Sequence, residues 1–429
     1  MKNQGEISFG GAVLMSINIM VGAGILFAVG TMTELAGSVS FLGWPLTALL
    51  LFPIIWGLSK ATHLFPGSGG FYQYCSVGIS PIAGVIAHWG YFLGYMGTVA
   101  SLATVLRNGI IVNTGSNFLD DYPMILNVAI VAVYALLNLI SVDKISKIQS
   151  TGTLLKITPI LFVIVIFAFF FERGLHIDLQ NINKIGMTVS TVIFAFLGFE
   201  ACCSISGLIK GGPQKVGGVV LVAFFITMVL YTTFHIGALF IMGPEKLGSE
   251  GVMSFPLYLG LSPALGAALQ VGISSAILLS WANSILGASL ANISNLHTMA
   301  VNKLILGDKI LTRVNSSNRP IYAVALFSLL MLAFITFITD VNILFSLTNL
   351  GVITALTLTM VAVFLTYLRQ KNYFQAAITF VSFGSCGAWI YYSLLQIPSF
   401  LFILPLLIGL LCGVAMYKVH QRRIDTSVT

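Results

Sequence analysis

The 429 residues are 57% hydrophobic and only 8% charged, and the mean hydropathy is +0.99. This composition excludes a water-soluble globular protein and a disordered chain, and it indicates an integral membrane protein. The formal net charge of +7 comes from residues between apolar segments, so it reports membrane topology and does not indicate a nucleic-acid-binding patch.

A transmembrane helix needs about 20 mostly apolar residues, and twelve segments satisfy that requirement. They are long continuous apolar runs without the short-range alternation of polarity typical of membrane strands, so we expect an all-α membrane protein. The predicted spans are 11–33, 39–62, 81–112, 124–140, 151–171, 185–208, 216–242, 262–290, 320–339, 343–368, 373–393 and 397–418.

Glycines interrupt the first and the sixth predicted spans, at residues 20–25 (MVGAGI) and 195–200 (AFLGFE). A break frees backbone N–H and C=O groups that lipid cannot satisfy, so it is stable only inside protein or beside a polar cavity. Discontinuous helices at matching positions of two inverted halves indicate a transporter binding site. The alternative is that Gly22, Gly24 and Gly198 only allow close helix packing.

Two ionisable residues lie inside apolar spans. Glu200 directly follows the break in the sixth span, and Lys156 lies about one and a half turns into the fifth predicted span. Charged groups in a membrane are costly and usually face a cavity or take part in proton relay or cation contact. The alternatives are a structural carboxylate bonded to nearby backbone N–H groups for Glu200, and snorkelling to the surface for Lys156. His88 and His235 stand alone and are expected to be packing residues.

Most Lys and Arg residues lie on one side of this layout, and only Arg173, Lys184 and Lys246 lie on the other. Because cytoplasmic loops carry the excess of Lys and Arg, we expect both termini to be cytoplasmic and the protein to lie in the cell membrane. The first apolar run lacks an evident cleavage site and is expected to be retained.

Other sites are not expected. The five cysteines are odd in number and none falls in a predicted outer loop, so no structural disulfide is predicted. The histidines lack zinc-binding spacing, and no phosphate-binding glycine loop or catalytic constellation is visible. We therefore expect no metal, no cofactor, no nucleic acid and no enzymatic activity.

Three stretches carry a family resemblance: residues 22–25 (GAGI), 66–72 (PGSGGFY) and 194–200 (FAFLGFE). They resemble the signature stretches of the amino acid-polyamine-organocation (APC) superfamily of transporters, and the similarity extends over nearly the whole chain. Within that superfamily the chain looks most similar to the bacterial basic amino acid/polyamine antiporters, the group that includes arginine/agmatine antiporters.

The resemblance implies a five-plus-five inverted-repeat core with a LeuT-like fold, in which helices 1 and 6 are discontinuous. The transport core is expected over residues 1–369, with repeats at about 1–172 and 185–369. Two peripheral helices are expected over 370–418, followed by a cytoplasmic tail over 419–429.

The resemblance also implies a substrate site. Backbone N–H groups at Gly22, Ala23, Gly24 and Ile25 would bind the substrate carboxylate, and carbonyls of the sixth helix would bind its amino group. Phe194, Ala195 and Leu197 would supply these carbonyls, and the Phe194 ring would cover the bound substrate. Trp281 would wall the site on its inner side, and Tyr91 would contribute to the same gate. Glu200 resembles a glutamate linked to proton sensing or gating. Lys156 resembles the lysine of sodium-independent members that replaces a bound sodium ion. Core packing or an interfacial belt is the alternative for each aromatic.

The sequence departs from the family pattern at three places. Ala28 and Val29 replace a proline usual after the first-helix glycines, the connector 294–299 lacks an acidic run, and Val99 stands where arginine exchangers carry a polar side chain. Guanidinium recognition is therefore doubtful, and a neutral or different amino acid is as compatible as arginine.

Two functional classes follow. The first is a secondary active transporter of amino acids or amines that works by alternating access, with exchange or proton coupling. The alternative is a non-transporting nutrient-sensing receptor or accessory subunit with the same fold. The expected partners are a small amino acid or amine, protons and the lipid bilayer, and a homodimer is compatible with the sequence.

Overall fold

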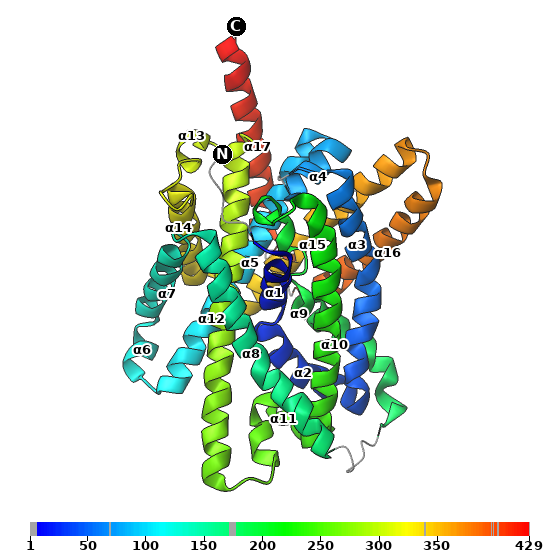
Figure 1. Ribbon diagram of the computed structural model, residues 1–429, viewed down its shortest axis with the longest axis vertical. Coiled ribbons are helices and arrows are strands. Elements are labelled where there is room, and N and C mark those ends of the chain that lie inside the picture. The colour runs from blue at the N-terminus through cyan, green and yellow to red at the C-terminus, as the bar shows by residue number, and fades with distance from the viewer. Residues whose placement is uncertain are drawn as a thin grey trace.

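The computed structural model describes residues 7–67, 70–170, 177–338, 340–395, 397, 399–400 and 403–428, and the regular structure in these residues is helical apart from two isolated β-bridges (Figure 1). Ser68 and Gly69 of the 66–72 stretch lie outside the described residues. So do Lys2 and Arg173, which entered the topology prediction, and Thr429 of the predicted tail.

The helices of the first half are short where the chain breaks or turns and long where it crosses the molecule. They are α1 (Phe9–Met20), α2 (Ala23–Ala36), α3 (Gly43–Leu64), α4 (Gly70–Gly78), α5 (Pro81–Thr114), α6 (Asn117–Asp121), α7 (Pro123–Leu137), α8 (Val142–Phe170) and α9 (Ile185–Phe196). Short 3₁₀ helices lie at Gly37–Leu42, Leu179–Lys184, Ala201–Cys203, Ser206–Leu208 and Pro213–Lys215.

The second half is built in the same way. Its helices are α10 (Val216–Met242), α11 (Pro244–Glu250), α12 (Pro263–Val301), α13 (Asp308–Leu311), α14 (Ile321–Phe337), α15 (Val341–Arg369), α16 (Tyr373–Leu395) and α17 (Leu404–Val428). A 3₁₀ helix at Val252–Tyr258 connects α11 to α12.

Within the described residues, eight helices are long and apolar enough to cross a membrane. A ninth candidate is a pair, Leu179–Val189 and Thr191–Cys203, that passes the test together and is bent by 57°. Three shorter apolar helices are also present, α1, α7 and α14. The protein is therefore an all-helical, multi-pass membrane protein.

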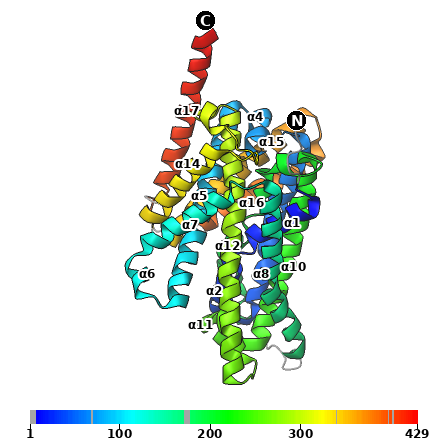
Figure 2. The ribbon, with the colours of Figure 1, turned by 60° about the vertical axis from the view of Figure 1, so that its left-hand side comes forward.

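The long helices run between two ends of the molecule, as Figures 1 and 2 show. We call them the α13 end, where α4 and α13 lie, and the α11 end, where α11 lies. α12 runs from one end to the other, and α17 projects beyond the α13 end.

Local sequence explains where α5 begins and ends. The Ser80 side chain accepts a hydrogen bond from the Ala83 N–H (3.3 Å), and Pro81 occupies the first turn, where its missing N–H leaves no gap in the bonding. At the other end Gly115 adopts a left-handed conformation (φ 58°, ψ 25°) that other residues avoid, so the helix stops there.

Glycines also bring α5 and α15 into direct backbone contact. A Cβ on Gly351 would lie 2.6 Å from Gly94 Cα, and a Cβ on Gly97 would lie 2.7 Å from the Leu344 carbonyl oxygen. Small residues allow such an approach between membrane helices, where packing and not hydrophobic burial drives association. This glycine contact fixes α5, which carries several residues of the site described below.

Two helices extend well beyond the spans predicted from the sequence, and for the same reason. The fifth span was placed at 151–171, but α8 begins at Val142; the eighth was placed at 262–290, but α12 continues to Val301. Both extensions contain polar residues that lower the local hydropathy without breaking the helix. Lys156 therefore lies deep within α8 and not near its start.

We predict that Gly351→Ala lowers the thermal unfolding midpoint of the detergent-purified protein. The added methyl group meets backbone atoms that cannot move independently, and overpacking of this kind costs about 1–3 kcal/mol. Gly384→Ala is the matched control, because a Cβ at Gly384 in α16 would have nothing within 4 Å. Equal midpoints for the two variants would contradict the glycine contact between α5 and α15.

Candidate functional site

The first helix break lies between α1 and α2. α1 ends at Met20, and Val21 and Gly22 adopt non-helical backbone angles before α2 begins at Ala23. The last carbonyls of α1 and the first N–H groups of α2 have no partners within their own helices. The N-terminal end of α2, with its N–H groups and positive dipole end, is suited to bind an anion such as a carboxylate.

The second break follows α9. α9 ends at Phe196, Leu197 is non-helical, and Gly198 has a φ of 118°, which side chains rarely tolerate. A Cβ on Gly198 would also lie 2.7 Å from Ile19 Cγ2 and 2.9 Å from the Met20 nitrogen. Only glycine meets both the backbone angle and the contact with the end of α1.

The two breaks pack directly against each other. Besides the contact of Gly198 with Ile19 and Met20, a Cβ on Gly24 would lie 2.8 Å from Ala195 Cα. Each break therefore places a glycine against the backbone of the other helix. The glycines thus serve helix packing as well as helix breaking, so the two explanations considered from the sequence are compatible.

Side chains from α8 and α12 satisfy the carbonyls that the first break frees. Lys156 donates hydrogen bonds to the Asn18 carbonyl and to Ser284 Oγ (3.1 Å), and Ser284 Oγ donates to the same carbonyl (2.9 Å). Ser280 Oγ donates to the Val21 carbonyl (3.3 Å). Lys156 is buried, so it does not snorkel to the surface.

Tyr231 of α10 joins the two breaks. Its hydroxyl donates to the Met20 carbonyl (2.7 Å), and the Ala195 carbonyl lies within the same reach (3.3 Å). The ring is fully buried and packs against Trp44 and Phe196. One hydroxyl therefore contacts the last residue of α1 and a residue of the last turn of α9.

Glu200 is fully buried beside the second break. One carboxylate oxygen accepts from the Gly198 N–H (3.1 Å), and the other accepts from the Tyr95 hydroxyl (2.9 Å). The first bond is the structural role considered from the sequence, since it satisfies an N–H that the break frees. The second bond links the break to α5.

A cavity of about 670 Å³ opens toward the α11 end and reaches both broken helices. Gly24, Phe194 and Trp281 line it together, and the Phe194 ring packs against Phe345 with a centroid separation of 4.0 Å. This volume accommodates a small organic molecule. Glu34 and Glu250 also line the cavity, so its wall carries carboxylates.

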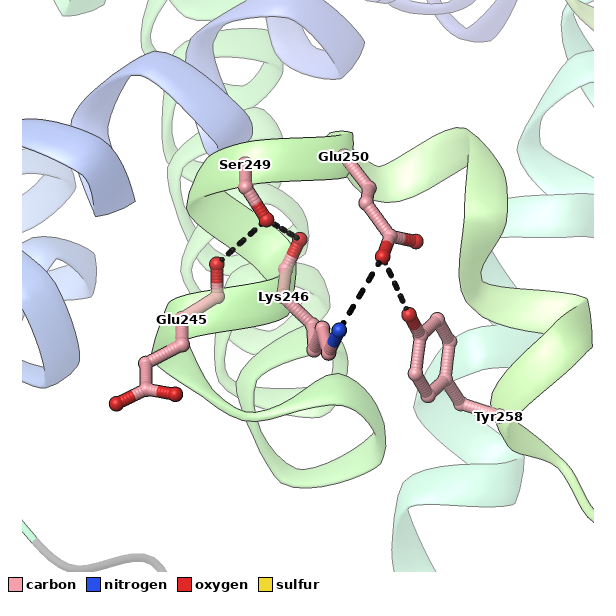
Figure 3. Close-up of polar contacts among 5 residues, drawn as sticks. All are labelled: Glu245, Lys246, Ser249, Glu250 and Tyr258. Carbon is pink, nitrogen blue, oxygen red and sulfur yellow. Dashed lines mark hydrogen bonds and ion pairs between the residues drawn. The ribbon is translucent and has the colours of Figure 1, made fainter.

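Glu250 is held in a network of polar contacts at the wall of this cavity (Figure 3). It accepts a hydrogen bond from the Tyr258 hydroxyl (2.7 Å) and pairs with Lys246 across one helical turn (3.7 Å). The hydrogen bond to Glu250 raises the pKa of Tyr258. Ser249 donates to the Glu245 carbonyl (2.9 Å) in the same turn. These contacts connect α11 to the following 3₁₀ helix.

A second, much smaller cavity lies deeper. Its volume of about 30 Å³ is enough for a water molecule but not for an amino acid. Gly22, Ile25 and Lys156 line it, and Leu26 and Val252 line both this cavity and the larger one. The smaller cavity thus adjoins the larger one and leads to the lysine.

The structure distributes the site residues predicted from the sequence as follows. Gly24, Phe194 and Trp281 line the large cavity, and Gly22, Ile25 and Lys156 line the small one. Ala195 contacts Gly24, and Leu197 is buried at the end of α9. Ala23 is the first residue of α2.

Tyr91 lies elsewhere, buried between Phe71 and Tyr95 with centroid separations of 4.5 Å to each. It lines neither cavity, and Tyr95, one turn further along α5, makes the contact with Glu200. The gate role predicted for Tyr91 stays a prediction, and Tyr95 was not singled out from the sequence. Tyr91 and Tyr95 are four residues apart and lie on the same face of α5, but this spacing does not show which of them contacts Glu200.

The hydrogen bonds of two further buried residues were not predicted, because their partners lie far away in the sequence. Tyr231 contacts residues 36 and 211 positions earlier. His235, expected to pack, is buried and hydrogen-bonded: its Nε2 lies 2.9 Å from Thr33 Oγ1, and its Nδ1 accepts from Trp44 Nε1 (3.0 Å). This network ties α2 to α3 and α10.

The comparison with protein families decides which class of membrane protein this is. A family model described as amino acid permease matches residues 7–425. The chain belongs to the amino acid permease family. This is a family of transporters and not of enzymes, and it lies within the APC superfamily. Family membership implies a LeuT-like fold.

Individual relatives of this permease are distant. It is 22% identical over 357 residues to the glutamate/serine transporter AimA of Bacillus subtilis (strain 168), an alignment covering 75% of this chain and 64% of that protein. It is 27% identical over 311 residues to the arginine/agmatine antiporter of Chlamydia felis (strain Fe/C-56), covering 65% and 61%. The corresponding antiporter of Chlamydia pneumoniae is 27% identical over 266 residues, covering 56% and 53%.

The alignments therefore span less than two thirds of the length of these relatives. They confirm the predicted resemblance at the level of the superfamily. They do not single out the antiporters, because a glutamate/serine transporter stands beside them.

We predict that Tyr231→Phe destabilises the permease by about 1–3 kcal/mol, because it leaves buried carbonyls without a donor. The ring contacts would persist, so the loss reports the hydroxyl alone. The measurement is chemical or thermal unfolding of the purified protein. Tyr391→Phe, at an exposed tyrosine of α16, is the control. Unchanged stability in Tyr231→Phe would show that this hydroxyl does not support the breaks.

Proposed function

We propose that this permease is a sodium-independent secondary active transporter of amino acids, working by alternating access with exchange or proton coupling. The observation that carries the proposal is the pair of interlocked helix breaks exposed to a cavity of about 670 Å³. A receptor would also need such a cavity, so turnover must be measured directly.

The substrate is proposed to bind at the inner end of the large cavity. The N-terminal end of α2 would receive the carboxylate, and the freed carbonyls after α9 would receive the amino group. Phe194 and Trp281 line the large cavity together with Gly24 and would enclose the side chain of the substrate. Val99 is buried and lines neither of these cavities, so it does not decide whether the substrate is arginine.

Lys156 supports sodium independence. Its ammonium group already binds the Asn18 carbonyl, which the end of α1 would otherwise offer to a bound cation. A fixed cation at this place would compete with sodium through its charge and its volume. Glu200 and Lys156 are the proposed coupling groups, because both are buried ionisable residues in contact with the breaks.

The arrangement in the membrane is likewise a proposal. Counting α1 with α2 as one broken span, and α7 and α14 as further spans, gives twelve crossings. This count is compatible with a five-plus-five inverted-repeat core over 1–369 and peripheral helices over 370–418. Lys303, Lys309 and Arg313 lie near α13, which supports a cytoplasmic α13 end. The large cavity would then open outward.

The proposal is tested by reconstituting the purified permease into liposomes preloaded with a mixed pool of amino acids and amines. Uptake of individual labelled amino acids is measured with and without a pH gradient and with sodium replaced by choline. Uptake that requires internal substrate would establish exchange, and uptake driven by the gradient alone would establish proton coupling. Folded protein that binds an amino acid but shows neither uptake nor counterflow would favour the receptor class.

We predict that Gly24→Ala lowers uptake at least about tenfold, because the methyl group would meet the Ala195 backbone and separate the two breaks. Gly10→Ala in α1 is the control, since a Cβ there has nothing within 4 Å. Initial rates are compared at equal amounts of folded protein. If Gly24→Ala transports at the rate of the unaltered protein, the contact between the two breaks is not part of the transport site.

We also predict that Glu200→Gln flattens the pH dependence of transport more than it weakens substrate binding. The amide keeps the size of the side chain and one acceptor for the Gly198 N–H, but it cannot change charge. Initial rates and substrate affinity are each measured across pH 5 to 8. A pH profile identical to that of the unaltered protein would exclude Glu200 as a coupling group.

A further inference from the structure

A third cavity, of about 500 Å³, lies at the α13 end, away from the proposed substrate site. Polar side chains from four parts of the chain line it: α4, the segment after the second break, the end of α12 and the connector before α14. They include Gln73, Ser204, His297, Asn302, Asn318 and Arg319. Neither the 20–24 break nor Glu200 lines this cavity, so it is separate from the large cavity.

Arg319 is the unusual member of this set. Only 3% of its surface is exposed, although it is charged. Its Nε donates to the Asn138 carbonyl at the end of α7 (2.9 Å), but its Nη2 is buried and has no hydrogen-bond partner among the described residues. A guanidinium carries five N–H donors, so most of its bonding capacity is unused.

The guanidinium also lacks a counter-ion. The described residues that line the cavity include no Asp or Glu, and no described carboxylate forms an ion pair with Arg319. Burial lowers the pKa of Arg319 to about 10, so it stays a cation at neutral pH. A buried cation that is neither paired nor fully hydrogen-bonded is costly, and this cost is removed when an anion binds.

A second polar group in the same wall is also without a partner. The Ser204 hydroxyl is buried and makes no hydrogen bond within the described part of the chain. Ser204 lies just after the 3₁₀ helix Ala201–Cys203 that continues the second break. Both residues line the cavity while these two unpartnered atoms are themselves buried, so a side-chain rotation would present a cationic donor from one element and a hydroxyl donor from another.

We propose that the cavity at the α13 end is a binding site for a small oxyanion, a carboxylate or phosphate group, held by Arg319. The guanidinium can donate two parallel hydrogen bonds to such a group, which is the geometry it forms most strongly. This site goes beyond the proposed transport function and does not depend on it.

The position of the site gives the anion a structural effect. The Arg319 backbone N–H is bonded to Asn315 Oδ1 (2.9 Å), so the residue belongs to the connector between α13 and α14. Ser204 belongs to the chain that follows the second break. An anion bound between these elements would stabilise the conformation in which the α13 end is closed to the breaks.

The test measures the thermal unfolding midpoint of the full-length purified protein against the concentration of sodium phosphate or sodium acetate, with ionic strength held constant by sodium chloride. Phosphate stabilises many proteins without binding, and that effect is common to all variants. The matched control is Arg313→Gln, which removes the same charge from an exposed position of the same connector. It is expected to respond as the unaltered protein does.

Arg319→Gln is expected to need an anion concentration about tenfold higher, or more, for the same rise in the unfolding midpoint, because a charge-assisted hydrogen bond is lost. If this variant does not fold, two others replace it. Arg319→Lys keeps the positive charge and should retain part of the response. Ser204→Ala breaks no described hydrogen bond and should weaken the response about threefold.

The choice of anion identifies the source of the ligand. A saturable shift with acetate points to the carboxylate of an amino acid, and a shift with phosphate alone points to free phosphate or a phosphate ester. Either result supports the site. No saturable shift in the unaltered protein, or equal shifts in the unaltered protein, Arg319→Gln and Ser204→Ala, would overturn it.

Discussion

The structure depends on one contact, the mutual packing of two interrupted helices. Gly24 lies against the Ala195 backbone, and Gly198 lies against Ile19 and Met20. A broken helix cannot face lipid, because each unsatisfied backbone group there costs several kcal/mol. Each break must therefore be buried by other protein elements, and here each break helps to bury the other. The rest of the fold is a scaffold that holds this pair together.

The scaffold supplies donors where the broken helices lack them. Lys156 from α8, Tyr231 from α10 and Ser284 from α12 all donate to carbonyls near the end of α1. At the α13 end the pair is joined again, because the Ile7 N–H donates to the Leu208 carbonyl (2.8 Å). The two broken helices are thus connected at the breaks themselves, through Tyr231, and again at the α13 end, through Ile7 and Leu208. Any motion that opens the α13 end would have to move them together or break these bonds.

The sequence could predict the breaks but not their partners. A glycine at a break is a local requirement of backbone geometry, so Gly22 and Gly198 were visible in the sequence alone. The depth of Lys156 was underestimated because Asp143, Lys144 and Lys147 lower the hydropathy of the first turns of α8. The role of Tyr231 depends on residues far apart in the chain, and no local pattern encodes such a pairing. The contact of Tyr95 with Glu200 joins residues 105 positions apart and is hidden from local patterns for the same reason.

The two ends of the molecule differ in how closely a cavity approaches the helix breaks, and this difference indicates the side from which a substrate would enter. Toward the α11 end, a cavity of about 670 Å³ reaches Gly24. Toward the α13 end, the cavity of about 500 Å³ reaches Ser204 but no residue of either break, and the buried rings of Tyr91 and Tyr95 lie beside Glu200. Of these two cavities in the described part of the chain, the one toward the α11 end reaches a break and the one toward the α13 end does not, which is compatible with the proposed alternating access. Because Glu200 holds both the Gly198 N–H and the Tyr95 hydroxyl, a change in its charge would act on the closed side of the crossing.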